Sequence, residues 1–165
     1  MKKIAFFLSL ILLSFQINAQ TKIKKSDIIG KWVLAVEEFK NIVTYDLDKD
    51  SIIMGDSGKA NLSKANISID SATKSMRPAF EIMRQMFYQF NEDGTGEIYY
   101  GQGPASDYKI SYIVDEESST ITTTDRHKKN EAQKIYKLKD KLLLITIQTP
   151  QNGGMEIWST LKKVQ

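Results

Sequence analysis

The sequence predicts an all-β domain, an up-and-down barrel of about eight strands with one short helix. Three observations support this fold class. Apolar and polar residues alternate in short runs over much of residues 87–163, which is the period of half-buried strands. Asn, Asp and Gly residues separate these runs as turns. Consecutive hairpins leave two free sheet edges, which closure into a barrel removes.

The first nineteen residues predict a secretory signal peptide. A short basic start precedes a mostly apolar run over residues 4–17, and Ala19 provides a small residue before a cut. The run is shorter than the ~20 residues that a membrane-spanning helix needs. We therefore expect a periplasmic or secreted mature domain, residues 20–165, that does not span the membrane. A lipid anchor is excluded because the chain has no cysteine.

Composition narrows the classes of function. The absence of cysteine excludes disulfides, thiolate metal sites and a cysteine nucleophile. The formal net charge of +3 falls to +1 when Lys2 and Lys3 are removed with the signal peptide. A nearly neutral domain gives no electrostatic basis for binding nucleic acid. His127 is the only histidine, so a multi-histidine metal site is impossible, and we expect no metal or other cofactor.

The first elements of the mature chain are a helical turn and a strand. Ser26–Gly30 combines a capping residue with a glycine stop, and alternate apolar residues of Trp32–Phe39 share one face. Residues 40–72 are hard to interpret, with short strands indicated at 42–47 and 51–54 around an acidic turn.

A helix is predicted over residues 75–86. Its apolar stripe recurs at spacings of four, three and four residues, and consists of Met76, Phe80, Met83 and Phe87. Pro78 is tolerated only in the first turn of a helix, which places the start near Ser75. We interpret the stripe as packing against the barrel.

The second half of the chain predicts seven more strands. They span 87–90, 97–100, 108–114, 120–124, 133–138, 142–148 and 155–163. The strongest hairpin signal lies at residues 91–96, where Asp93, Gly94 and Gly96 form the turn and both glycines can adopt positive φ.

Two motifs resemble those of lipocalins. Gly30-Lys31-Trp32 resembles the Gly-x-Trp motif that opens the first lipocalin strand, and residues 90–95 are similar to the Phe-x-x-Asp-Gly-Thr turn of small bacterial exported lipocalin-like (calycin) domains. The resemblance implies a lipocalin-like barrel whose narrow end is closed by Trp32. It also implies a basic side chain over this Trp, for which Lys162 or Lys163 is suitably late in the chain.

Aromatic residues in the predicted strands form the candidate ligand-lining set. They are Tyr88, Phe90, Tyr100, Tyr108, Tyr112 and Tyr136. Tyrosine combines apolar area with a hydroxyl, which suits a semi-polar cavity, and an eight-stranded barrel is just wide enough for one small ligand. The equal alternative is that these rings simply fill a small barrel.

No catalytic or metal-binding residue is nominated. Asp46, Asp48 and Asp50 alternate as at the start of a calcium loop, but the bidentate glutamate of such a loop is replaced by Ser57, so a solvated acidic turn is favoured. His127 lies in a charged segment that predicts a surface loop. Adjacent carboxylates such as Glu37/Glu38 point to opposite faces of a strand and do not suggest an acid–base pair.

The leading functional hypothesis is an exported, non-enzymatic binding protein that holds a small apolar or amphipathic ligand in the barrel. The alternative is a protein-interaction module, inhibitor or immunity-like, with a filled barrel and a protein partner; an enzyme ranks third. A pocket in the barrel would favour the first hypothesis. A packed interior beside an exposed apolar patch would favour the second.

Export predicts a defined mature N-terminus. Protein recovered from its native compartment should begin at Gln20, either free or cyclised to pyroglutamate, and intact-mass measurement tests this. A mature species that retains residues 1–19 would contradict the predicted cleavage.

Overall fold

The computed structural model describes residues 22–104, 108–147 and 154–164, so the predicted signal peptide lies outside the described residues. The helices are α2 (Lys25–Ile28), α3 (Asp56–Lys64) and α4 (Ile69–Met83). The strands are β1 (Gly30–Phe39), β2 (Val43–Asp46), β3 (Ser51–Met54), β4 (Phe87–Phe90), β5 (Thr95–Tyr99), β6 (Lys109–Asp115), β7 (Thr120–Asp125), β8 (Asn130–Leu138), β9 (Lys141–Ile147) and β10 (Glu156–Lys163).

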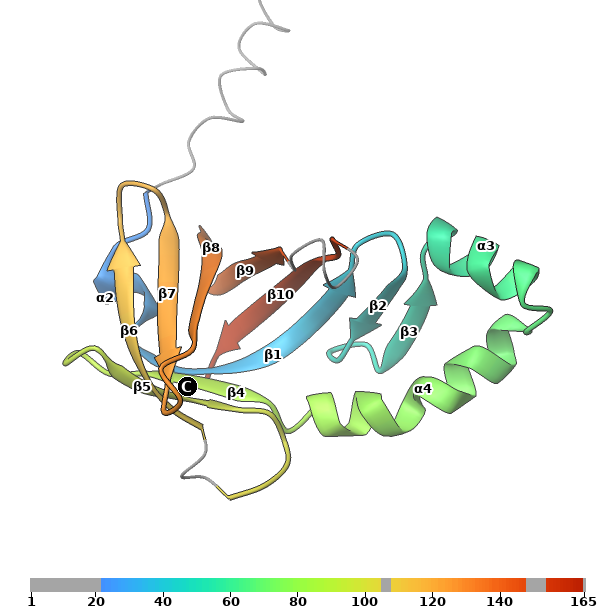
Figure 1. The fold of residues 1–165 in the computed structure, drawn as a ribbon, viewed down its shortest axis with the longest axis horizontal. Coiled ribbons are helices and arrows are strands. Elements are labelled where there is room, and N and C mark those ends of the chain that lie inside the picture. Colours follow the sequence, from blue (N-terminus) through green and yellow to red (C-terminus); the bar gives the residue numbers. More distant parts are fainter. Residues whose placement is uncertain (1–21, 105–107, 148–153, 165) are drawn as a thin grey trace, which may run out of the picture.

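Eight strands form a closed, antiparallel, up-and-down barrel, which confirms the predicted fold class. The order around the barrel is β1, β4, β5, β6, β7, β8, β9 and β10. Closure comes from the pairing of β10 with β1, which runs from Trp32 opposite Lys163 to Phe39 opposite Ile157. The first and last described strands therefore pair with each other in one sheet (Figure 1).

β1 is shared between the barrel and an extension. Its first residues, Gly30 to Val33, pair with β4, and its last residues, Val36 to Phe39, pair with β2. The register against β10 shifts between Leu34 and Val36, which is a β-bulge. Because of this extra residue, Leu34 pairs with Leu161 and Glu37 with Ser159, and β1 keeps both side chains on its inner face.

The extension consists of β2, β3, α3 and α4, which project to one side of the barrel (Figure 1). It has its own small core, formed by Val43, Tyr45, Met54, Ala72 and Phe80. Leu47 and Met83 pack against both this core and that of the barrel, so apolar contact is continuous between the two.

The helices depart most from the prediction. α4 starts at Ile69 rather than near Ser75, and its N-cap Ser68 accepts a hydrogen bond from the Ser71 backbone N at 3.2 Å. Pro78 therefore lies in the helix interior, where a proline costs ~3 kcal/mol. Burial of the α4 side chains in the extension's core offsets this cost.

Two further corrections concern the region around α4. α3 occupies residues 56–64, where no element was predicted, and the predicted helical turn at Ser26–Gly30 is the short helix α2, so the described residues contain three helices rather than one. Phe87 begins β4 and does not continue the helical stripe. The strands agree better: those predicted at 42–47, 51–54 and 87–90 are confirmed as β2, β3 and β4, and the others agree within a few residues.

The hairpin between β4 and β5 is confirmed, with a different role for one glycine. Gly94 has a φ of +86°, and the Asp93 carboxylate accepts hydrogen bonds from the Thr95 backbone N at 2.9 Å and hydroxyl at 2.6 Å. Gly96 has no positive φ, contrary to the prediction. It lies within β5, where an added Cβ would be 2.4 Å from the carbonyl oxygen of Gln89, so close strand approach requires it.

Trp32 is buried at one end of the barrel. It is 4% exposed, and its indole Nε1 donates a hydrogen bond to the Ile28 carbonyl at 2.7 Å. Lys163, rather than Lys162, lies over the ring, with its Nζ 5.4 Å from the ring centroid. Gly30 has a φ of +120°, and an added Cβ would be 3.0 Å from Cε of Lys163. Glycine at this position therefore permits the stacking of Lys163 on Trp32.

Replacement of Trp32 by alanine should destabilise the domain by ~3–5 kcal/mol, because it leaves a large cavity and removes the contact with Lys163. Urea titration measures this free energy of unfolding. Trp158→Ala is the matched control, since Trp158 is on the outer face of β10 and only half-buried. Equal losses for the two variants would contradict a closing role for Trp32.

Gly96→Ala should destabilise the barrel by roughly 1–3 kcal/mol, because its Cβ would force β4 and β5 apart. Thermal unfolding would detect this loss. Gly154→Ala measures backbone strain without a steric clash, since Gly154 has a φ of +65° and no atom lies within 4 Å of its added Cβ. An unchanged melting temperature for Gly96→Ala would show that the strands adjust freely.

Candidate functional site

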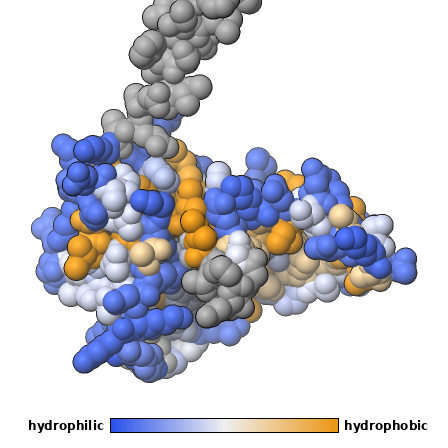
Figure 2. Space-filling model, turned by 45° about the horizontal axis from the view of Figure 1, so that its top comes forward, coloured by the Kyte–Doolittle hydropathy of each residue, from blue (hydrophilic) through white to orange (hydrophobic). Residues whose placement is uncertain are grey.

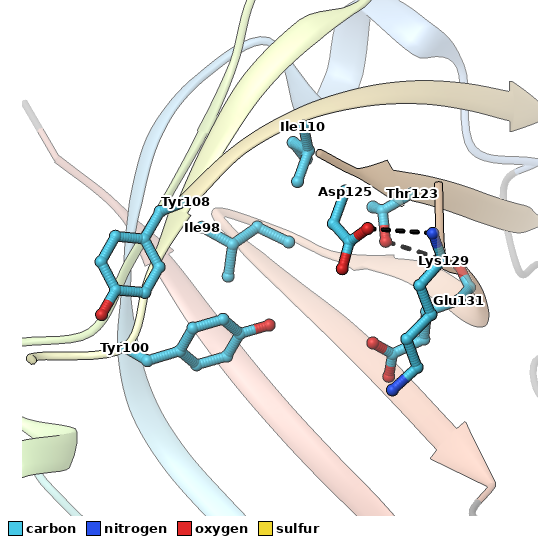
Figure 3. A pocket seen from close by; sticks show the side chains of 8 residues that line it. All are labelled: Ile98, Tyr100, Tyr108, Ile110, Thr123, Asp125, Lys129 and Glu131. Atoms are coloured by element: carbon cyan, nitrogen blue, oxygen red, sulfur yellow. Dashed lines mark hydrogen bonds between the residues drawn. The ribbon is translucent and has the colours of Figure 1, made fainter. Parts of the chain in front are cut away.

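A pocket with a volume of about 210 Å³ opens at the end of the barrel opposite Trp32 (Figure 3). Its lining residues are Ile98, Tyr100, Tyr108, Ile110, Thr123, Asp125, Lys129 and Glu131. They come from β5, β6, β7, β8 and the segments that border these strands. Figure 3 shows the two tyrosine rings on one side of the pocket and the charged side chains on the other.

Strand alternation places these side chains inside the barrel. On β6, Ile110, Tyr112 and Val114 are at least half-buried, whereas Ile113 on the opposite face is 75% exposed. The predicted alternation of this strand is thereby confirmed.

The inner face of the barrel changes character from the closed end to the mouth. On β7, the inward positions run from Ile121, which is fully buried, through Thr123 to Asp125 at the mouth. On β8, they run from Ile135 through Gln133 to Glu131. Apolar side chains thus fill the closed end, and polar ones line the open end.

The strands on the other side repeat this gradient. On β9 and β10, buried Leu144 and Leu161 are followed toward the mouth by Thr146 and Ser159. Gln133 on β8 donates to the Thr146 hydroxyl at 2.6 Å, so polar groups at this level satisfy each other. Four strands with the same order of side chains identify the mouth as a built feature of the barrel.

The β7–β8 loop is held in place by Asp125. Its Oδ1 accepts hydrogen bonds from the backbone N of Lys129 at 2.9 Å and of His127 at 2.8 Å. The Thr123 hydroxyl donates to the Glu131 carbonyl at 3.5 Å. These contacts fix the position of Lys129, a basic residue of the pocket wall.

Tyr100 supplies a phenol that stays protonated. Burial, followed by the negative charges of Glu131 and Asp125, raises the pKa of Tyr100 to about 12. The residue is still 48% exposed, and its hydroxyl points across the pocket toward Glu131 (Figure 3). Tyr100 can therefore donate a hydrogen bond to a bound molecule at neutral pH.

Glu37 lies on the inner face of β1, just past the bulge. It is 8% exposed, and its Oε2 has no hydrogen-bond partner among the described residues. Burial raises the pKa of Glu37 to about 7, against a lowering by the hydrogen bond from Ser159. Burial also raises the pKa of neighbouring Tyr88 well above its ordinary value, with a further contribution from the charge of Glu37.

The structure divides the six predicted ligand-lining residues. Tyr100 and Tyr108 line the pocket. Tyr88, Phe90 and Tyr112 are at most 5% exposed and belong to the barrel core.

The core aromatic residues hold one another, and the sixth predicted residue lies elsewhere. The rings of Phe90 and Tyr112 pack edge to face at 5.1 Å, and the Tyr112 hydroxyl donates to the Asn91 carbonyl. Tyr136 pairs with Leu143 on the outer face of β8, away from the interior.

Sequence reasoning missed the polar part of the site, namely Glu37, Thr123, Asp125, Lys129 and Glu131. A usable signal exists in the strands themselves. On β7, Thr123 and Asp125 lie two and four positions from buried Ile121, and on β8 Glu131 lies four positions from buried Ile135, so these residues share a face. A run that changes from apolar to acidic on one face indicates the open end of a barrel.

The acidic turn and the single histidine form no metal centre. Asp46 pairs with Lys49 at 2.7 Å, Asp48 with Lys162, and Asp50 with Arg77 at 2.9 Å and with Arg84. His127 is exposed and accepts a hydrogen bond from Arg126 at 3.0 Å. Within the described ranges, no group of three or more His, Cys, Asp and Glu side chains is placed to hold a metal ion.

None of the described helices combines the length and the apolar character needed to cross a membrane.

Comparison with known proteins assigns this chain neither a family nor a function. No protein-family model matches the chain, and no curated protein matches it. A crystal structure of a DUF4847 family protein from Bacteroides vulgatus ATCC 8482 is similar, with 14% sequence identity and a TM-score of 0.47. The match covers 82% of this chain and 92% of that chain. No function follows from a likeness at this level.

The raised pKa of Glu37 predicts that stability falls as pH rises. The folded pKa is above the ordinary value of 4.5, so the fold favours the protonated acid. The stabilisation by the protonated acid is fully present below pH 4.5 and is lost as the pH rises through about 7. At 1.36 kcal/mol per pKa unit, the total loss in the free energy of unfolding is roughly 3 kcal/mol. Urea titrations of Glu37→Gln from pH 4.5 to 8 test it.

At pH 4.5, the free energy of unfolding of Glu37→Gln should be similar to that of the natural protein. At pH 8, it should be higher than that of the natural protein. Glu38→Gln on the opposite face is the matched control and should follow the natural protein. Parallel stability curves for all three would contradict the burial of an ionisable Glu37.

Proposed function

We propose that this chain is an exported, lipocalin-like binding protein that holds a small amphipathic molecule in the mouth of its barrel. The observation that supports this most is the pocket at the open end, where Ile98 and Ile110 provide apolar area and Tyr100, Thr123 and Asp125 provide polar groups. A pocket that is apolar with a few convergent polar groups is typical of ligand sites.

The size of the pocket limits the ligand. Its volume of about 210 Å³ is below the ~300–1,000 Å³ of sites for drug-sized molecules. The pocket does not extend to the closed end, which is occupied by fully buried side chains such as Phe90, Ile121 and Leu142. A small molecule of mixed polarity therefore fits better than a long fatty acid or a tetrapyrrole.

The relation to lipocalins is supported by the closed end. Trp32 beneath Lys163, with Gly30 beside it, has the arrangement that the Gly-x-Trp resemblance implies. Export is supported by the apolar N-terminal segment and by Ala19 before the predicted cut. Together these features favour a periplasmic or secreted carrier or sensor of a small molecule.

A second candidate function is protein interaction, which the outer face of β8 and β9 favours. Ala132, Ile145 and Ile147 line a shallow apolar hollow there, and Ile147 is 69% exposed. Figure 2 shows apolar patches between hydrophilic surfaces of the molecule. This candidate ranks second, because single exposed apolar residues are common on soluble proteins.

Ligand-observed NMR with mature protein and a library of small amphipathic molecules tests the proposed function. A bound molecule should lose about tenfold in affinity with Tyr100→Ala, because the aromatic wall and one hydroxyl are removed, equivalent to ~1.4 kcal/mol. Tyr136→Ala, on the outer face, is the matched control and should change affinity less than twofold. Equal effects of the two variants, or no binding at all, would move the preference to the interaction module.

A further inference from the structure

We propose that Glu37 is the anchor of the barrel's ligand site, and that the site takes a small primary amine whose ammonium group pairs with the Glu37 carboxylate. This inference rests on the proposed function and names the ligand class of the same site.

The first argument is that Glu37 lacks a partner. A buried carboxylate is normally paired or fully hydrogen-bonded, because an uncompensated one costs several kcal/mol. Here Oε2 has no partner within the described part of the chain, and the side chain is 8% exposed. Neighbouring Glu38 occupies the outer face of the same strand without this cost. An unsatisfied buried acid is expected where a ligand supplies the missing partner.

The second argument is position. The bulge between Leu34 and Val36 places Glu37 opposite Ser159 on the inner face. Ser159 is buried on the inner face of β10, toward the mouth from Leu161, so Glu37 points into the barrel near its open end. The charge of Glu37 acts on the phenol of Tyr100, which lines the mouth pocket. Glu37 is not one of the residues that line this pocket, but it lies on the inner face of the barrel at the same end.

The third argument is charge. The pocket wall carries Asp125 and Glu131 against a single cation, Lys129. With Glu37 ionised, carboxylates outnumber cations three to one at the mouth. Low-dielectric walls strengthen such a field, so the mouth attracts a cation and repels an anionic head group. A fatty acid or another carboxylate is disfavoured for this reason as well as by size.

The fourth argument is the match of donors and acceptors. An ammonium group is compact and has three N–H donors. Glu37 Oε2, the Ser159 hydroxyl and the phenol oxygens of Tyr88 and Tyr100 are acceptors in this region. Tyrosine faces add cation–π attraction. A short apolar tail would then lie against Ile98 and Ile110.

Three probes of nearly equal size test the proposal: 2-phenylethylamine, 2-phenylethanol and phenylacetate. Isothermal titration calorimetry at pH 8, where Glu37 is ionised, measures binding to mature protein. We expect the amine to bind at least tenfold more tightly than the alcohol or the acid. Glu37→Gln should remove this preference, whereas Glu38→Gln should retain it.

A second measurement shows whether the amine contacts Glu37. The carboxyl carbon of Glu37 is followed by NMR during a pH titration, and its midpoint should fall by at least one pH unit with saturating 2-phenylethylamine. The alcohol should leave the midpoint unchanged.

The possible failures are distinguishable. In one outcome, the alcohol binds the natural protein and Glu37→Gln equally, the amine is not preferred, and Tyr100→Ala weakens binding. This result would overturn the amine proposal and leave the proposed function standing. No binding of any probe would overturn the amine proposal. If the wider library also fails to bind, the proposed function falls with it.

Discussion

The architecture depends on the antiparallel pairing of β1 with β10. This pairing joins the first and last strands of the domain and removes both free edges of the meander. It also brings Lys163 over Trp32 at one end and Ser159 beside Glu37 at the other. The stability of the closed end and the chemistry of the mouth therefore follow from one register. A slip by a single residue would turn both sets of side chains to the other face.

The bulge in β1 gives this strand two functions. Before the bulge, β1 completes the barrel against β4; after it, β1 carries β2 and the extension. Leu47 and Met83 link the extension's core to that of the barrel, so the extension is packed rather than tethered. The ion pairs of Asp50 with Arg77 and Arg84 lie on the surface and add little, since exposed pairs contribute at most ~1 kcal/mol.

The interior gradient separates stability from function. Apolar side chains at the closed end provide the burial that holds a domain without disulfides. The mouth is less well packed. It contains a pocket lined by the carboxylates of Asp125 and Glu131, and the buried Oε2 of Glu37 has no hydrogen-bond partner among the described residues. Such departures from consistent folding rules are expected at functional sites, where they are maintained at a cost in stability. The mouth is thus the part of the barrel where ligand chemistry is to be sought.

The sequence by itself determined the local features: the strands, their alternation, and the turn at Asp93 and Gly94. These depend on residues near one another in the chain, for which periodicity and turn preference are sufficient. It did not determine the start of α4, because packing of Phe80 outweighed the cost of an interior Pro78. Tertiary structure alone decided which aromatic rings are packed and which line the pocket. It also decided that Glu37 rather than Glu38 points inward, because a bulge and strand pairing between distant segments fix that choice.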